Sequence, residues 1–248
     1  MGKMTLQFGL DLKKLRRSLK GLPSFVTDLM QYKRAQTQES VPLKIVNLYP
    51  ILHERFAQAG DVDWHYFFQD IWAARKIFEN KPERHVDIGS SISGLIAHLL
   101  VFREVEVVDI RPLKHNVDNL RFIQDDATKL EQFPDDTLES VSSLHAAEHF
   151  GLGRYGDTVD PNAHIKFMKS LARVLKPGGR LYFALPVGKE RVEFNAQRVL
   201  SPFTVLHIFE DLKLLSFSAV NGAQFCENID PLSVKEENFA CGLFEFTK

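Results

Sequence analysis

Cysteine, long hydrophobic runs and net charge are all scarce in this chain of 248 residues. The two cysteines, Cys226 and Cys241, match no metal-ligand spacing, which is typical of a reduced, cytoplasmic protein. No apolar run reaches membrane-spanning length, and the first residues lack the apolar core of a signal peptide. A formal net charge of -1 gives no reason to expect a nucleic-acid partner. The composition therefore predicts a globular protein of one domain plus an extension.

Positive charge is concentrated towards the amino terminus. We expect residues 1–80 to form a helical, basic extension and residues 81–248 to form the main domain. The charged residues of the first forty positions are Lys3, Lys13, Lys14, Arg16, Arg17, Lys20, Lys33 and Arg34, against Asp11, Asp28 and Glu39. Leu12, Leu15, Leu19 and Leu22 recur at helical spacing, which indicates an amphipathic segment. Two interpretations stay open: peripheral docking on a membrane surface or an acidic protein, and a cap on the domain with its charges in water.

The stretch HVDIGSSISGLIAHLLVFREVEVVDIRP, residues 85–112, has the most informative pattern. An apolar run ends in Asp87 and Gly89, a turn of small residues and a helical pattern follow, and a second apolar run ends in Asp109. A doubly wound α/β sheet holds a nucleoside with this layout. The glycine lets the backbone approach the ligand, and the acid accepts hydrogen bonds from ribose hydroxyls. The sequence therefore predicts a site for an adenosine-containing cofactor.

Strands and helices alternate through the rest of the chain. We expect helices at residues 63–80, 92–101, 161–175 and 202–211, and strands at 84–88, 105–110, 122–123, 140–144 and 180–185. The sequence Lys176–Pro177–Gly178–Gly179 ends one helix and allows a tight reversal, and residues 187–198 read as a polar loop. Two strand-like runs, 212–219 and 239–246, indicate a closing antiparallel hairpin. The predicted fold class is α/β, with a doubly wound, mainly parallel sheet, helices on both faces, and ligands at the carboxyl ends of the strands.

In order and spacing, these motifs resemble the class I S-adenosylmethionine-dependent methyltransferases, which have a Rossmann-like fold. The resemblance covers residues 84–185 and rests on Asp87 and Gly89, Asp109, Asp126–Ala127, Glu148–His149, and the Leu175–Gly179 sequence LKPGG. It implies S-adenosylmethionine as the cofactor and an adenine contact at Asp126, for which Asp125 is a rival by one register. The candidate cofactor-binding residues are Asp87, Gly89, Ser90, Ser91, Asp109, Ile110, Asp126 and Ala127.

Three longer stretches resemble a narrower group, a domain-of-unknown-function family of methyltransferase-like proteins. They are HYFFQDIWAARKIF at residues 65–78, SSLHAAEHFGLGRYGD at 142–157 and FNAQRVLSP at 194–202. This resemblance implies no particular acceptor. The chain departs from the superfamily at the glycine turn, where glycine usually recurs at alternate positions: Ser91 and Ser93 stand there, and Gly94 comes late. We interpret this turn as a variant of the cofactor site.

His145, Glu148 and His149 follow the predicted fourth strand, where a methyl acceptor should lie, and are the candidate catalytic residues. A neutral histidine is suited to receive the acceptor's proton. A structural role for these side chains beneath the cofactor stays open. The same letters, HAAEH, match a zinc-protease pattern, but that pattern needs a helix and a third ligand, so we expect no metal here.

Two polar loops are candidates for binding the acceptor. The loop GLGRYGDTVD, residues 151–160, combines glycines with Arg154, Tyr155 and Asp157, and the loop after the fifth strand carries Asn195 and Arg198. Ordinary surface positions are the alternative for both. The function expected is methyl transfer to a small acceptor, with a saccharide as one candidate.

Two other functions stay open. A nicotinamide-dependent oxidoreductase or epimerase would share the first two strands and the acid, but the short-chain type needs Tyr-x-x-x-Lys, which no tyrosine of this chain provides. A catalytically silent protein that binds cofactor or glycan and scaffolds a complex would suit the basic amino-terminal segment. Turnover of labelled cofactor separates a silent protein from an active one.

Overall fold

The computed structural model describes residues 8–35, 45–60 and 62–248. Lys3 and Glu39 of the predicted basic segment lie outside these ranges. The chain divides into two compact units, Met1–Val62 and Asp63–Lys248. This division falls earlier than the expected boundary at residue 80. Helix α3 (Trp64–Asn80) belongs to the second unit because it buries Trp72, Ala73 and Ile77 in that unit's core.

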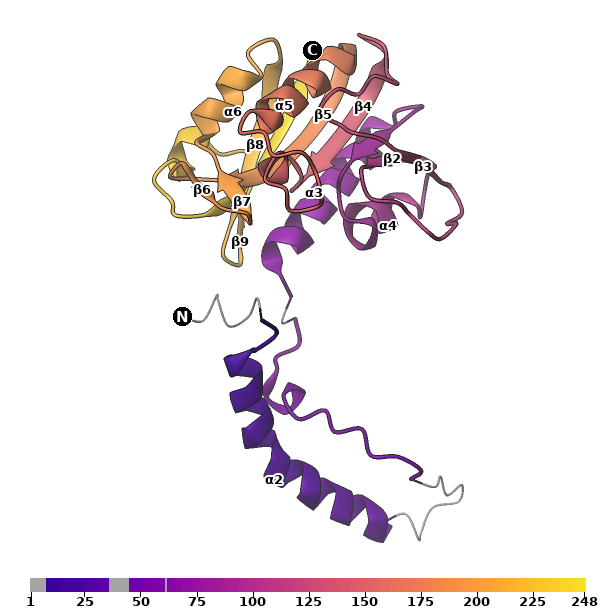
Figure 1. The fold of residues 1–248 in the computed structure, drawn as a ribbon, viewed down its shortest axis with the longest axis vertical. Coiled ribbons are helices and arrows are strands. Elements are labelled where there is room, and N and C mark those ends of the chain that lie inside the picture. Colours follow the sequence, from indigo (N-terminus) through magenta and orange to yellow (C-terminus); the bar gives the residue numbers. More distant parts are fainter. Residues whose placement is uncertain (1–7, 36–44, 61) are drawn as a thin grey trace. The chain divides into compact units, whose positions relative to one another are not determined.

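Helix α2 (Leu12–Ala35) is the main element of the first unit (Figure 1). Asp11 begins it, accepting a hydrogen bond of 2.9 Å from the backbone amide of Lys14. A one-turn 3-10 helix, Glu54–Phe56, belongs to the same unit. The two pieces meet at Gly21, where an added Cβ would lie 2.1 Å from the carbonyl oxygen of Leu52. This approach explains why a glycine is tolerated inside the helix.

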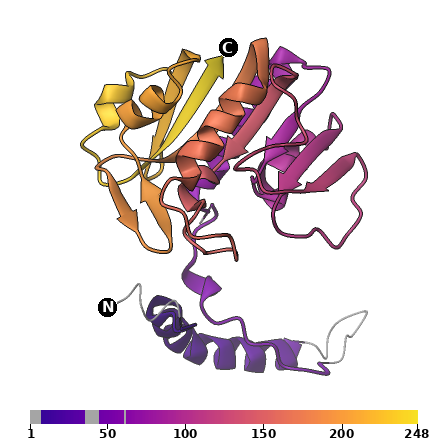
Figure 2. The same ribbon diagram turned by 45° about the horizontal axis from the view of Figure 1, so that its top comes forward.

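The second unit is built on an eight-stranded sheet with the order β3-β2-β1-β4-β5-β10-β8-β9 (Figures 1 and 2). The strands are β1 (Val86–Ile88), β2 (Val105–Asp109), β3 (Leu120–Gln124), β4 (Leu138–Leu144), β5 (Leu175–Val187), β8 (Lys213–Asn221), β9 (Gln224–Cys226) and β10 (Ala240–Thr247). Strands β1 to β5 pair in parallel, so their carboxyl ends share one edge. Strand β10 lies antiparallel between β5 and β8, which confirms the closing hairpin.

Helices cover both faces of the sheet, as predicted. One apolar core contains Phe167 and Leu171 of α5 (Ala163–Val174) and Val205 of α6 (Pro202–Ile208). The other contains the buried face of α3 and Leu99 of α4 (Ala97–Leu99). Helix α5 crosses in front of the sheet in Figure 2. Both faces of the sheet are therefore packed against helices.

Three local differences from the expected elements have physical causes. The helix expected at 92–101 is a π-helical turn, Ile92–Ile96, followed by α4, with a kink at Gly94. A Cβ at Gly94 would lie 2.5 Å from the Asp70 carboxylate of α3, so the late glycine serves helix packing. Strand β5 begins at Leu175, before the expected residue 180, because the KPGG sequence continues the strand edge. The expected polar loop contains a two-stranded hairpin, β6 (Arg191–Glu193) and β7 (Gln197–Val199).

Candidate functional site

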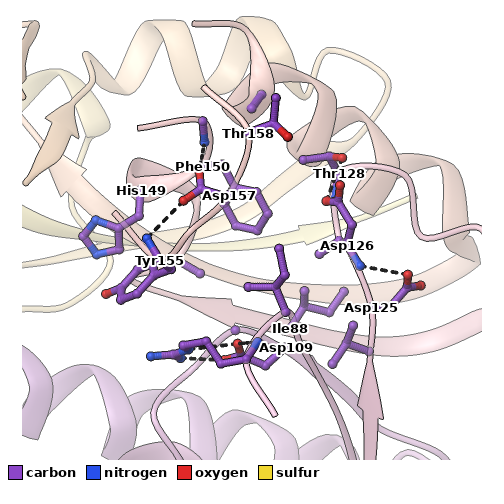
Figure 3. Close-up of a pocket in the computed structure, with 18 of the residues that line it drawn as sticks. Ile88, Asp109, Asp125, Asp126, Thr128, His149, Phe150, Tyr155, Asp157 and Thr158 are labelled. Atoms are coloured by element: carbon purple, nitrogen blue, oxygen red, sulfur yellow. Dashed lines mark hydrogen bonds and ion pairs between the residues drawn. The ribbon is translucent and has the colours of Figure 1, made fainter. Parts of the chain in front are cut away.

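A cavity of about 250 Å³ lies at the carboxyl ends of β1 to β4 (Figure 3). Its wall combines strand ends with the loop that follows β4. The lining includes Gly89, Asp109, Arg111, Asp125, Asp126, Ala127, His145, His149, Tyr155 and Asp157. Open α/β sheets bind ligands outside the carboxyl ends of their strands, so the cavity has the position expected of a nucleoside site.

The turn after β1 approaches the cavity through Gly89. Its φ of 75° lies in the left-handed region, and an added Cβ would lie 3.0 Å from the Cβ of Ala146. Asp87 is fully buried behind this turn and accepts hydrogen bonds from the Ser90 amide (3.0 Å) and hydroxyl (2.7 Å), and from the Ser142 hydroxyl. Burial raises the pKa of Asp87 to about 6. Asp87 and Ser90 therefore fix the turn to β4, while Gly89 is the part that faces the cavity.

Asp109, at the end of β2, lines the cavity as predicted, but Arg111 occupies much of its carboxylate. Arg111 donates from its backbone amide (2.8 Å) and Nε (2.9 Å) to one oxygen, and from its terminal nitrogen (2.5 Å) to the other. The Arg111 guanidinium also lies 4.7 Å from the ring centre of Tyr155. A carboxylate offers about four acceptor sites. Two ribose hydroxyls would therefore have to share the remaining site or displace part of this pair.

Two neighbouring acids follow β3 and both line the cavity. Asp126 accepts from the amide (3.0 Å) and hydroxyl (2.8 Å) of Thr128 through Oδ1, which forms a turn (Figure 3). Asp125 accepts from the Asp126 amide, and its other oxygen, Oδ2, is buried without a hydrogen-bond partner among the described residues. Each acid thus keeps one oxygen that the protein does not use. Ala127 is buried beside them and leaves room for a flat ring.

His145 lines the cavity at the end of β4 in a left-handed conformation, with φ at 51°. Its Nδ1 lies 2.6 Å from the amide oxygen of Gln69 on α3. Because that oxygen accepts, Nδ1 carries the proton and Nε2 keeps its lone pair. Burial lowers the pKa of His145 to about 3, so the ring is neutral. Tyr66 packs against the ring at 5.2 Å between centroids.

His149 is also a neutral ring with a defined tautomer. Its Nδ1 lies 2.7 Å from the carbonyl oxygen of Ala196, which can only accept, so the lone pair is on Nε2. Burial and the Arg154 charge lower the pKa of His149 to about 4. Nε2 lies 3.7 Å from Glu148, whose carboxyl oxygens are buried without a hydrogen-bond partner among the described residues. Burial raises the pKa of Glu148 to about 8, so this side chain is protonated at neutral pH.

The loop after β4 is held in shape by Asp157. One carboxylate oxygen accepts from the amides of Gly151 (2.8 Å) and Gly153 (3.3 Å), and the other accepts from the amide of Tyr155 (3.1 Å). Tyr155 consequently projects into the cavity wall beside Asp109 (Figure 3). Arg154 donates to the carbonyl of Ala196 at 2.9 Å. The loop therefore covers the same cavity as the strand-end acids, instead of lining a separate one.

The two candidates on the later loop lie outside the cavity wall. Asn195 is exposed, between β6 and β7. Arg198 is 4% exposed and donates to the carbonyls of Phe150 (2.6 Å), Glu148 (3.3 Å) and Pro161 (3.4 Å). Its contacts brace the backbone of the loop after β4.

Nine of the sixteen sequence candidates line the cavity: Gly89, Asp109, Ile110, Asp126, Ala127, His145, His149, Tyr155 and Asp157. The other seven do not line it. Of these, Asp87, Ser90, Glu148 and Arg198 are buried, and Ser91, Arg154 and Asn195 are exposed. The sequence analysis missed Arg111, although its place two residues after the strand-end acid was a usable signal. It also missed Gln69, which only the packing of α3 brings to His145.

The HAAEH residues do not form a helical metal motif. His145 ends β4, and Ala147–His149 is a single 3-10 turn. Among residues 8–35, 45–60 and 62–248, no group of three or more histidines, cysteines and acids is placed to hold a metal ion.

One protein family, described as "Caenorhabditis protein of unknown function, DUF268", has a model that matches residues 97–234. No curated protein sequence matches the chain. Similar solved structures share the fold at low identity. The N-methyltransferase NodS from Bradyrhizobium japonicum WM9, in complex with S-adenosyl-L-homocysteine, has a TM-score of 0.52 at 13% identity, covering 88% of this chain and 97% of that one.

Two further structures show how widely this fold is used. The 1,6-didemethyltoxoflavin-N1-methyltransferase of Burkholderia thailandensis, with bound 1,6-didemethyltoxoflavin and S-adenosylhomocysteine, has a TM-score of 0.53 at 13% identity; the match covers 75% of this chain and 80% of that one. The [4+2]-cyclase SpnF has a TM-score of 0.54 at 12% identity and covers 77% and 85%. The second unit therefore has the Rossmann-like methyltransferase fold, while the activity must be argued from the site.

Proposed function

Since the chain belongs to the DUF268 family, whose description names no activity, we propose from the site itself that it binds S-adenosylmethionine and transfers the methyl group to a small polar acceptor. The observation that carries this proposal is the convergence of Gly89, Asp109 and Asp126 on one cavity at the carboxyl edge of the sheet. Asp109 ends β2, Asp126 follows the adjacent strand β3, and the Gly89 turn follows β1. Two acids in these positions suit the hydroxyls of a ribose and the exocyclic amine of adenine.

The cavity residues fit this cofactor chemically. Asp109 would hold the ribose hydroxyls, and Asp126 or Asp125 would accept from the exocyclic amine of adenine beside Ala127. The buried Oδ2 of Asp125, which has no hydrogen-bond partner among the described residues, supports a bound group with an N–H or O–H donor at this point. The bound cofactor supplies an activated methyl group on a sulfonium with a neutral leaving group. The protein's part is then to place the acceptor and to hold its proton.

His149 is the residue best placed to orient an acceptor. The Ala196 carbonyl fixes the ring so that Nε2, 3.7 Å from the buried Glu148 carboxyl, keeps the lone pair with which it would accept a hydrogen bond from an acceptor O–H or N–H. A pKa of about 4 keeps the ring neutral but makes it a weak base. We therefore assign His149 mainly to positioning the acceptor. Positioning of the reactants can lower the activation barrier by roughly 7–11 kcal/mol. A general base typically raises the rate about a hundredfold, which is a smaller effect. His145, three residues before Glu148, is likewise a neutral ring with its lone pair on Nε2.

The polar loop supports a small acceptor that bears hydroxyl or acidic groups, and a saccharide remains one such candidate. Tyr155 offers an apolar ring face and a hydroxyl, and Arg154 offers a donor fork. A nicotinamide cofactor is disfavoured because antiparallel β10 lies beside β5, where the dinucleotide-binding sheet continues in parallel.

Calorimetry tests the cofactor. We expect S-adenosylmethionine and S-adenosylhomocysteine to bind and NAD to bind far more weakly. Tight NAD binding without S-adenosyl ligand binding would overturn the proposal. Binding without transfer of labelled methyl to any acceptor, across a panel of hydroxylated small molecules, would favour the silent scaffold.

A further inference from the structure

Helix α2 carries a continuous apolar stripe that the site does not use. Its members are Leu12, Leu15, Leu19, Leu22, Val26 and Met30, all exposed. Spacings of three and four residues place them on one face of the helix. At 1.5 Å per residue the stripe is about 27 Å long. Their exposed fractions run from 42% for Val26 to 63% for Leu19, so no member of the stripe is buried.

Other residues of the first unit pack on a different side of the helix. The chain near Leu52 approaches the backbone at Gly21, and the Lys20 ammonium lies 4.5 Å from the ring centre of Phe56. Gly21 is about 100° or more around the helix from the stripe at Leu15, Leu19 and Leu22. The segment that stabilises α2 within its unit therefore leaves the stripe uncovered.

The charge of α2 is strongly one-sided in sign. The helix contains Lys13, Lys14, Arg16, Arg17, Lys20, Lys33 and Arg34, and one acid, Asp28. Asp28 is already paired with Arg55 of the facing segment. Arg16 follows the stripe on its flank, and lysine and arginine stems can lie along apolar surface while their charges stay in water. An apolar stripe with basic flanks is complementary to an anionic lipid surface.

We propose that α2 docks the protein on the surface of an anionic bilayer, lying in the plane of the interface. The apolar stripe reaches the boundary between headgroups and acyl chains, and the basic residues contact lipid phosphates and carboxylates. No helix among the described residues is long and apolar enough to cross a membrane, and a helix with seven basic residues fits attachment at the surface. This inference is independent of the proposed function, because it uses no residue of the cavity.

Flotation of the full chain with vesicles tests the docking. Wild-type protein should float with vesicles of phosphatidylserine and phosphatidylcholine, and much less with phosphatidylcholine alone or in high salt. Leu15→Gln with Leu19→Gln should lower the partition coefficient at least about tenfold. Lys13→Gln with Arg16→Gln should lower it about tenfold or more, because each basic residue near the surface is worth roughly fivefold. The control pair, Val101→Gln with Val192→Gln, removes exposed valines of the second unit and should change nothing.

Four results would overturn the proposal. The wild-type protein could stay with the buffer, or the leucine variant could float as well as the control. The leucine variant could also melt at a clearly lower temperature without lipid, or change from dimer to monomer in light scattering. Either change would show that the stripe packs against protein, from this chain or a second copy. We expect the leucine variant to have the melting temperature and the sedimentation behaviour of the wild type.

Discussion

The strand-end side of the cavity and its loop side reach the same space by different means. On the strand side, Gly89, Asp109 and Asp126 face the cavity because parallel strands end together. On the loop side, polar residues of similar type mostly form hydrogen bonds with the protein's own backbone. Asp157 binds three backbone amides of its own loop, and Arg198 binds three carbonyls beneath it. Residues at the strand ends thus offer the cavity side chains with unused acceptor oxygens, whereas Asp157 and Arg198 of the loops are occupied by the protein's own backbone.

The largest expected effect concerns Glu148, which belongs to the loop side but faces no ligand. Between its ordinary pKa of 4.5 and its raised pKa of about 8, the native protein binds a proton that the unfolded chain releases. The free energy of unfolding therefore falls as pH rises through this window, by about 5 kcal/mol for this group between its two pKa values. Glu148→Gln should abolish that part of the pH dependence.

Chemical denaturation at a series of pH values measures this difference. Glu131→Gln, at an exposed position, is the control and should keep the wild-type dependence. If Glu148→Gln and wild type lose stability in parallel as pH rises, the buried carboxyl is not protonated in the native state.

Arg198→Ala tests whether the later loop is structural. Removing the buried guanidinium leaves three carbonyls without this donor, and we expect a loss of about 3 kcal/mol in the free energy of unfolding. Arg154→Ala, the matched change, loses a less buried donor to one carbonyl and should cost less than about 1 kcal/mol. Equal stabilities of the two variants in denaturant titrations would erase the distinction drawn between these arginines.

Asp109→Ala tests the strand side directly. We expect cofactor affinity to fall by about 1.5–3 kcal/mol, or roughly tenfold to above a hundredfold, because the ribose hydroxyls lose a charged acceptor. Asp118→Ala, an exposed acid of the same unit, is the calorimetric control. Unchanged affinity in folded Asp109→Ala protein would show that the pair with Arg111 is its whole role.

A matched pair of amides resolves the neighbouring acids. Asp125→Asn and Asp126→Asn each replace one acceptor oxygen with a donor that repels the adenine amine. The variant at the true contact should lose roughly tenfold in affinity, near 1.4 kcal/mol, and its neighbour less than about threefold. Calorimetry with S-adenosylhomocysteine reports both, and equal small losses would move the adenine elsewhere.

The loop tip is expected to affect the cofactor little. Arg154→Ala with Tyr155→Ala should abolish transfer to a known acceptor and change cofactor affinity by less than about tenfold, or 1.4 kcal/mol. Because Tyr155 lines the same cavity as Asp109, this experiment distinguishes an acceptor site from a lid over the cofactor. A loss of cofactor as large as in Asp109→Ala would make the loop a lid over the cofactor.

The sequence predicted the sheet and its acids well because both depend on local periodicity. Asp109 ends an alternating apolar run, and its neighbours in the sheet follow from the alternation of strands and helices. The role of Arg198 was not predictable, because it depends on a loop some fifty residues earlier being folded against it. Gly94 was noted as late, but only the packing of α3 shows that Asp70 requires it.

Arg111 contacts both a residue of the strand side and a residue of the loop side of the cavity. It holds the carboxylate of Asp109 and lies against the ring of Tyr155. A ligand that takes over the oxygens of Asp109 changes the support beneath Tyr155, and by thermodynamic reciprocity a ligand that pins Tyr155 changes affinity at Asp109. If the chain transfers methyl groups as proposed, the Arg111 contacts predict that binding of the cofactor at Asp109 and of the acceptor at Tyr155 depend on each other.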